Sequence, residues 1–192
     1  VSGTGKSELP RLYSRFGGLH FLLVPVVPNW DTPADLFGFF DYMSKQFKPT
    51  DLLRAMVQCQ TPPEDGGISD SMLLVLLDEM NLARAELYLS ELLSRLEGRR
   101  HRGETNEMPI DIGPGANSFN VSLGGNLLFV GTVNEDESTN TLSDKVLDRS
   151  NVIYFPRPKK LVTRDQDSLA PPRSSWLSYG AWEGWRQPAN VL

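Results

Sequence analysis

Six consecutive apolar residues, Met72 to Leu77, constrain the fold of this 192-residue chain more than any other stretch. Turn-forming residues precede the run, and its length suits a strand better than a helix. A strand without polar positions has to be covered on both faces, which is typical of a parallel sheet between two layers of helices. The run is also too short to span a bilayer, so we expect no membrane partner.

Other apolar runs alternate with helical patterns, which implies right-handed crossovers and a mainly parallel sheet. Pro25 inside the first run suggests an edge strand. The mixed segment 36–59 predicts two short helices broken near Pro49, and residues 107–123 predict a hairpin. Further strands are expected at residues 21–27, 127–130 and 152–155, and helices at residues 6–16, 142–147 and from Ala85 to the glycine at 98.

The length of the chain fits one domain with a sizeable core, and its composition is ordinary for a globular protein. We expect this core over residues 1–156, followed by a proline- and tryptophan-containing segment at 157–192, whose tryptophans should dock on this domain or a neighbour. A net charge of −5 argues against wholesale nucleic-acid binding but leaves room for a local basic patch. Cys59 is the one cysteine, which excludes an internal disulfide and fits a reducing, cytoplasmic setting.

The chain begins with the closing half of a phosphate-binding loop, G-x-x-x-x-G-K-[ST]. One glycine before Val1 would complete the motif, so we expect a first strand upstream. Glycines let backbone N–H groups converge on phosphate, the following helix points its positive end at the anion, and a lysine and a hydroxyl contact phosphate and Mg²⁺. The alternative is a surface turn before a helix. The loop residues are Gly3, Thr4, Gly5, Lys6 and Ser7.

Two adjacent carboxylates, Asp78 and Glu79, end the buried apolar run. In open α/β sheets this end of a strand lies at the edge where ligands bind. Asp78 is therefore expected in the Mg²⁺ shell, and Glu79 is expected to polarise an attacking water. The alternative is a solvated charge pair that opens a loop.

Four segments, in order, resemble AAA+ P-loop ATPases of the McrB/MoxR-like (dynein-related) branch, with McrB-like proteins the nearest. DEMNLAR (78–84) resembles the Walker B segment and NLLFVGTVNED (126–136) the sensor 1 strand. LSDKVLDRS (142–150) resembles the segment before the last core strand, and WDTPADLFG (30–38) the region after the second strand. The resemblance covers residues 1 to about 156. It implies a three-layer α-β-α P-loop NTPase core whose first strand and helical lid are missing or incomplete here.

The resemblance also implies roles for two further residues. Asn134 takes the sensor 1 role of holding the hydrolytic water, although an asparagine can also simply cap a strand end. Arg149 takes the place of an arginine finger that reaches the neighbouring subunit, the alternative being a salt bridge to Asp148 or Asp144. Glu137 stands where McrB proteins carry arginine, which leaves the choice between ATP and GTP open.

What the resemblance implies overall is an ATP- or GTP-hydrolysing, Mg²⁺-dependent ring motor, usually a homo-hexamer. A McrB-like motor would act with a nuclease subunit on DNA, and a MoxR-like one would remodel proteins. A non-hydrolysing oligomeric scaffold is the rival from another class. The basic turn at residues 99–102 could contact a polymer in a ring channel or be a solvated loop. His20 and His101 are isolated from other ligand types, so no histidine metal site is expected.

Overall fold

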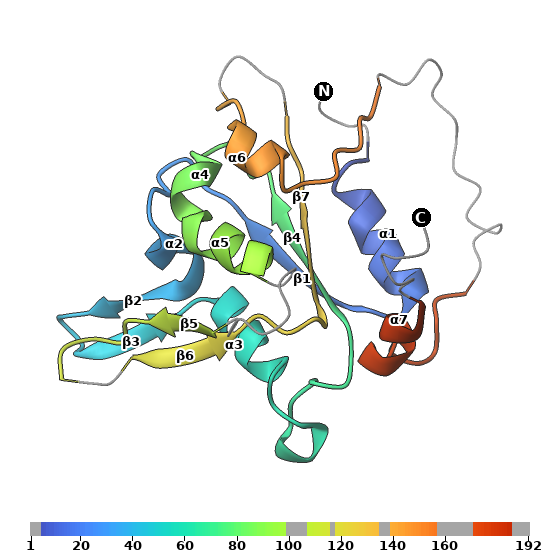
Figure 1. Ribbon diagram of the computed structural model, residues 1–192, viewed down its shortest axis with the longest axis horizontal. Helices are drawn as coiled ribbons and strands as arrows, with labels where there is room; N and C mark the ends of the chain where they lie inside the picture. Colours follow the sequence, from blue (N-terminus) through green and yellow to red (C-terminus); the bar gives the residue numbers. More distant parts are fainter. Residues whose placement is uncertain (1–4, 99–106, 116–117, 135–138, 157–170, 186–192) are drawn as a thin grey trace.

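The computed structural model describes residues 5–98, 107–115, 118–134, 139–156 and 171–185 (Figure 1). Among them, three strands form a parallel sheet in the order β1-β4-β7. These strands are β1 (His20–Pro25), β4 (Leu73–Asp78) and β7 (Leu127–Gly131). The expected mixed α/β fold with a parallel sheet is confirmed, as is the placement of the Pro25 strand at an edge of the described sheet.

Helices and two antiparallel hairpins surround this sheet (Figure 1). The described helices are too short or too polar to cross a membrane. The hairpins pair β2 (Gly38–Asp41) with β3 (Gln46–Pro49), and β5 (Glu107–Ile110) with β6 (Phe119–Ser122). The helices are α1 (Glu8–Gly17), α2 (Pro33–Phe37), α3 (Asp51–Gln58), α4 (Ala85–Tyr88), α5 (Ser90–Gly98), α6 (Asp144–Leu147) and α7 (Tyr179–Trp185), with one 3-10 turn, η1 (Pro63–Asp65).

The central strand β4 divides the apolar interior into two clusters. Side chains alternate across a strand, so Leu73, Val75 and Leu77 face the cluster beneath α2 to α5. Met72, Leu74 and Leu76 face a smaller cluster that includes Leu19 and Leu177. Each fully buried leucine stabilises the fold by about 1.5–3 kcal/mol. The all-apolar run is thus explained by burial on both faces, as the sequence predicts.

Helix α1 follows the predicted phosphate loop and runs along the second face of the sheet (Figure 1). Its proline, Pro10, lies in the first turn, where a missing backbone N–H costs no helical hydrogen bond. Gly18 ends the helix in the left-handed conformation (φ 72°) and donates its N–H to the carbonyl of Ser14. The predicted helix at 6–16, stopped by glycine, is confirmed.

Between residues 36 and 59 the structure differs from the two consecutive helices expected. Helices α2 and α3 are present, but the β2–β3 hairpin separates them. Gly38 makes the hairpin possible because its φ is 127°, and a Cβ there would lie 2.4 Å from the carbonyl oxygen of Lys48. Thr50 then caps α3 by accepting a hydrogen bond from the N–H of Leu53 (3.3 Å).

The strand expected at Val152–Phe155 is not formed, and that prediction is wrong. The side chains that should be buried, Val152, Ile153 and Tyr154, are 71%, 73% and 75% exposed. A strand needs a neighbour for its backbone hydrogen bonds, and no described strand pairs with this segment. β-Branched apolar residues alone therefore do not make it a strand.

The C-terminal segment 171–185 packs against the amino-terminal ends of β1 and β4. Leu177 is buried, donates its N–H to the carbonyl of Gly18 (2.6 Å) and accepts from the N–H of Met72 (3.0 Å). Trp182 packs against the smaller apolar cluster, and Trp176 stacks on His20. The expectation that the tryptophans dock is confirmed for these two, and the surface they use is this domain's own.

Candidate functional site

The carboxyl ends of β4 and β7 bring the expected site residues to one edge of the sheet. The parallel register pairs Leu77 with Gly131, so the next residues, Asp78 and Thr132, lie side by side. The start of α1 reaches the same edge through Ser7. This edge is where open parallel sheets bind their ligands.

Asp78 is held by two hydroxyl groups on one carboxylate oxygen. Ser7 Oγ donates to Asp78 Oδ1 at 2.6 Å, and Thr132 Oγ1 donates to the same atom at 2.7 Å. The adjacent hydroxyl and carboxylate oxygens of Ser7 and Asp78 are ligands that suit Mg²⁺. The described residues contain no cluster of three His, Cys, Asp or Glu side chains. A Mg²⁺ ion here would therefore complete its shell with water and phosphate oxygens, which this ion commonly does.

Glu79, Asn134 and Lys6 form a second connected group at the same edge. Asn134 Nδ2 donates to Glu79 Oε1 at 3.0 Å, and Lys6 Nζ donates to Asn134 Oδ1. Lys6 and Asn134 are 128 residues apart in the chain, so only the fold joins them. The structure thus gathers a cation, an amide and an exposed carboxylate that the sequence assigned to one site.

The backbone of Glu79 adopts a left-handed conformation, with φ of 55°. Such a conformation costs a non-glycine residue about 1–3 kcal/mol unless the surroundings hold it. Here the N–H of Glu79 donates to Thr132 Oγ1 at 2.8 Å. The hydroxyl of Thr132 therefore fixes Asp78 through its proton and Glu79 through its lone pair.

Asn81, in the turn after β4, forms hydrogen bonds to the backbone that follows β7. It is 2% exposed, and its Nδ2 donates to the carbonyl oxygens of Asn134 (2.7 Å) and Asn140 (3.1 Å). Its Oδ1 accepts from the N–H of Asn134 (3.2 Å). These bonds fix the backbone that carries the Asn134 side chain.

Thr132 and Asn81 are the functional residues that sequence reasoning missed. Both lie inside the segments DEMNLAR and NLLFVGTVNED, but neither had a role assigned to it. Asn81 gives little signal, because its partners are backbone carbonyls 53 and 59 residues away. Thr132 could have been found from the sequence, because it is a polar residue that directly follows a buried strand.

Two residues of the predicted phosphate loop, Gly3 and Thr4, lie outside the described residues. Gly5 has a φ of 83°, and its carbonyl accepts from the N–H of Leu9 at 3.0 Å. A glycine is needed here because side-chain-bearing residues avoid this φ. The basic turn at 99–102 and Glu137 also lie outside the described residues.

Arg149 is held by an intramolecular ion pair rather than lying among the site residues. Its Nη2 and Nε donate to Glu97 Oε2 at 2.7 and 3.1 Å, and Nη1 donates to the carbonyl of Lys145 at 2.7 Å. The salt-bridge alternative named Asp148 or Asp144 as the acid, and the acid is instead Glu97. A role for Arg149 between subunits stays a prediction.

Among the solved structures similar to this chain is a Cytophaga hutchinsonii protein, provisionally named an ATPase, that is 20% identical over 82% of this chain, with a TM-score of 0.42. The match covers 41% of that protein, so this chain spans about two-fifths of its length. No protein-family model and no curated protein matches the chain.

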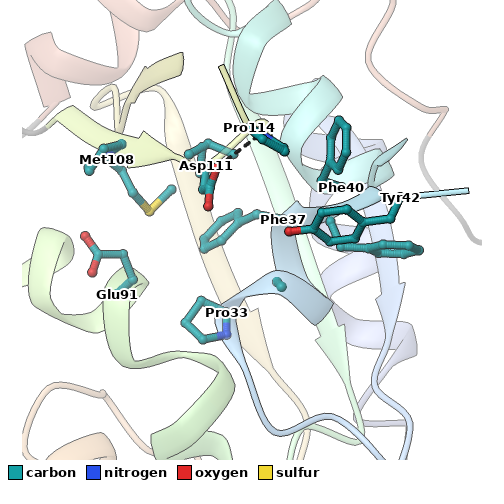
Figure 2. Close-up of a pocket in the computed structure, with 14 residues that line it drawn as sticks. Pro33, Phe37, Phe40, Tyr42, Glu91, Met108, Asp111 and Pro114 are labelled. Carbon is teal, nitrogen blue, oxygen red and sulfur yellow. Dashed lines mark hydrogen bonds between the residues drawn. The ribbon is translucent and has the colours of Figure 1, made fainter. Parts of the chain in front are cut away.

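A separate cavity of about 580 Å³ lies between α2, the β2–β3 hairpin and the β5 strand (Figure 2). Figure 2 shows Phe37, Phe40 and Tyr42 around it, with two carboxylates at its rim. Both carboxylates are already used within the chain, because Glu91 pairs with Arg95 (2.9 Å) and Asp111 accepts from the N–H of Gly113 (2.9 Å). The residues that line this cavity include none of the candidate site residues at the sheet edge.

Replacing Thr132 by valine should remove the two hydrogen bonds of its hydroxyl group without leaving a cavity. The change removes the hydrogen bond to Asp78 and leaves the partly buried N–H of Glu79 without its partner, so we expect the free energy of unfolding to fall by about 1–3 kcal/mol. Thr132→Ser keeps the hydroxyl and serves as the control. Denaturant unfolding of both variants checks this, and equal stability of the valine variant and the parent would contradict the role of the hydroxyl.

Proposed function

We propose that this chain is the nucleotide-binding core of a Mg²⁺-dependent nucleoside triphosphatase. The observation that carries the proposal is the convergence of Lys6, Ser7, Asp78, Glu79 and Asn134 at one edge of the sheet. Two separate loops and the start of a helix have to meet for this to occur. A surface turn and an unrelated solvated charge pair would have no reason to lie within hydrogen-bonding distance.

The binding step follows from the groups that face the edge. Lys6 supplies a positive charge for the β- and γ-phosphates, and α1 begins at the same place with its positive end. One of its present partners, Asn134 Oδ1, is an uncharged oxygen, which a phosphate oxygen can replace at a gain in electrostatic energy. When nucleotide binds, the Lys6 ammonium group can therefore exchange its hydrogen bond to the Asn134 amide for one to a phosphate oxygen.

Ser7 and Asp78 would hold the Mg²⁺ ion, which supplies positive charge that neutralises the phosphate oxygens. Thr132 keeps the Asp78 carboxylate turned towards Ser7, because it donates to the same oxygen. The hydroxyl of Ser7 can rotate its proton away from Asp78 and present a lone pair instead. Neither side chain then needs to move far.

Glu79 and Asn134 act on the attacking water. Glu79 is exposed at the end of the strand, and its carboxylate accepts from the Asn134 amide. A carboxylate can accept a proton from a water while the amide orients that water's oxygen. The left-handed backbone of Glu79, held by Thr132, directs the residue out of the line of β4. Glu79 is the general base and Asn134 the orienting group in this proposal.

The proposal is tested by single-turnover hydrolysis with the full chain. Release of inorganic phosphate from ATP or GTP is expected in the presence of Mg²⁺, and EDTA should stop it. Testing both nucleotides side by side settles the choice that the sequence leaves open. Nucleotide binding without phosphate release under any of these conditions would favour the non-hydrolysing scaffold, and no binding at all would overturn the proposal.

A finer proposal concerns assembly and partner. The DEMNLAR and LSDKVLDRS segments support a McrB-like ring, with a hexamer as its expected form and a nuclease subunit or DNA as partner, over a MoxR-like protein remodeller. Arg149 lies in the second of these segments and is exposed. Its pairing with Glu97 keeps the guanidinium ordered at the surface, where an adjacent subunit can reach it.

Arg149→Ala should therefore lose most hydrolysis while it still binds nucleotide. If the arginine acts on the neighbouring site, mixing this variant with Glu79→Gln subunits restores part of the activity, since some interfaces regain both groups. Arg54→Ala, which removes an exposed arginine from α3, is the matched control. Phosphate release in mixed samples is the measurement, and the absence of any rescue would argue that Arg149 does not act between subunits.

A further inference from the structure

A second cavity, of about 340 Å³, lies between α1 and the C-terminal segment, at the end of the sheet opposite the phosphate site. Three arginines and two aromatic side chains line it together with a proline: Arg11, Arg15, Arg173, Phe21, Trp176 and Pro172. None of the residues that line it is acidic. In a chain of net charge −5, such a local concentration of positive charge requires an explanation.

The three guanidinium groups have no carboxylate partner among the described residues. The basic residues that form ion pairs in the described part of the chain are four others, namely Lys48, Arg54, Arg95 and Arg149. Arg11 and Arg15 are four positions apart on α1, an arrangement in which like charges repel. Arg173 adds a third charge from far along the chain, and its Nη1 donates to the carbonyl of Gly17 (3.4 Å). An anion bound between them would relieve this repulsion.

The aromatic side chains add a flat surface beside these charges. Trp176 stacks on His20, with ring centroids 4.0 Å apart, yet it remains 60% exposed. Burial lowers the pKa of His20 by more than nearby Asp70 raises it, so the imidazole supports the indole as an uncharged ring at neutral pH. The guanidinium of Arg11 lies 5.7 Å from the ring of Phe21. Exposed tryptophan next to arginine is the combination on which unpaired bases stack.

Backbone contacts hold this surface in place. Gly18 lets the C-terminal segment approach closely, because a Cβ there would lie 2.5 Å from the carbonyl of Ser175 and 2.8 Å from Cδ of Arg173. Leu177 anchors the segment directly after Trp176 through its buried side chain and its hydrogen bond to Gly18. The site is thus formed in the folded chain from two parts that are more than 150 residues apart.

We propose that this cavity binds single-stranded nucleic acid, with backbone phosphates on Arg11, Arg15 and Arg173 and a base stacked on Trp176. A single strand fits better than a duplex, whose bases are stacked on each other and cannot reach the indole. An acidic peptide would satisfy the charges but leave the exposed indole without a flat partner. Along α1 the lining residues begin at Arg11, four residues or about 6 Å of helix after Ser7, and continue past the end of the helix to Gly18.

The test is fluorescence anisotropy of a labelled twelve-nucleotide oligo-dT with the full chain at low salt. We expect Arg15→Ala and Arg173→Ala each to weaken binding about tenfold. The double variant should also lower the slope of log Kd against log salt by about 1.4, which is the value for two lost phosphate contacts on a single strand. Trp176→Ala should weaken binding more than Trp176→Phe, which keeps an aromatic face.

Two controls separate this site from the rest of the molecule. Arg54→Ala removes a surface arginine outside the cavity and should leave oligonucleotide binding unchanged. Lys6→Ala should also leave it unchanged, even where it abolishes nucleotide binding, so that the two proposals fail independently. Loss of oligonucleotide binding in Lys6→Ala would place the strand on the phosphate loop and overturn this proposal.

Three other outcomes would overturn it as well. They are the absence of oligonucleotide binding at low salt, unchanged binding in the Arg15→Ala/Arg173→Ala double variant, and equal competition by inorganic phosphate or by a phosphoserine peptide of matched charge. Thermal unfolding of each variant guards against loss of the fold. Arg15→Ala is well suited to this purpose, because the residue is exposed on a helix and alanine favours helix.

Discussion

Lys6→Ala is expected to abolish nucleotide binding. Lys6 is the positive side chain that the fold brings to the carboxyl edge of the sheet, where it contacts Asn134. Charge-assisted bonds to phosphate are about twice as strong as neutral hydrogen bonds, and no other lysine or arginine hydrogen-bonds to the site residues in the described chain. We therefore expect the Kd for Mg-nucleotide to rise at least about a hundredfold.

Isothermal titration with ATP and GTP measures this change, and Lys145→Ala provides the matched control. Lys145 is an exposed lysine on α6 whose side chain is not among the site residues, so its removal should leave the Kd as it is. Unfolding curves show whether the Lys6 variant keeps its fold. If affinity survives in a folded Lys6→Ala protein, residues 3–7 are not a phosphate-binding loop.

Glu79→Gln should have the largest effect on turnover while it leaves binding intact. Glutamine has the same shape and can still accept the hydrogen bond from Asn134, but it cannot take a proton from water. Loss of a general base slows a reaction by about 10²–10⁴-fold. Single-turnover phosphate release gives the rate, and a titration under the same conditions shows that the Kd is unchanged.

The control for this variant is Glu64→Gln, which changes an exposed glutamate in η1 outside the site. Its rate should match that of the parent. Equal rates for the parent and Glu79→Gln would remove the enzyme interpretation and leave the oligomeric scaffold. A parallel loss of binding would instead indicate that Glu79 holds the ligand rather than activating water.

The parts of the fold that were predictable from sequence are those that depend on local pattern. The run Met72–Leu77 is apolar throughout because both faces are buried, and the end of α1 follows from the glycine that adopts a left-handed φ. The run at Val152–Phe155 has the same local character, yet it is exposed. Whether such a run becomes a strand depends on a neighbour, and a local pattern does not contain that information.

In the candidate site too, some residues are predictable from the local sequence and others depend on contacts that only the fold creates. The motif residues Lys6, Ser7, Asp78 and Glu79 are recognisable because their spacing and residue types carry the chemistry. Thr132 was not, because its importance depends on the register between β4 and β7. The partner of Arg149 was also misjudged, since Glu97 is 52 residues away and nearer acids were available in the sequence.

The left-handed backbone of Glu79 affects which residues position 79 can accept without strain. Glycine or asparagine would adopt a φ of 55° with less strain, so a chain optimised for stability alone would carry one of them there. Substitution by glycine should accordingly be tolerated by the fold. Glutamate at position 79 strains the backbone more than glycine or asparagine would. Of the three residues, however, only glutamate places a carboxylate at this position.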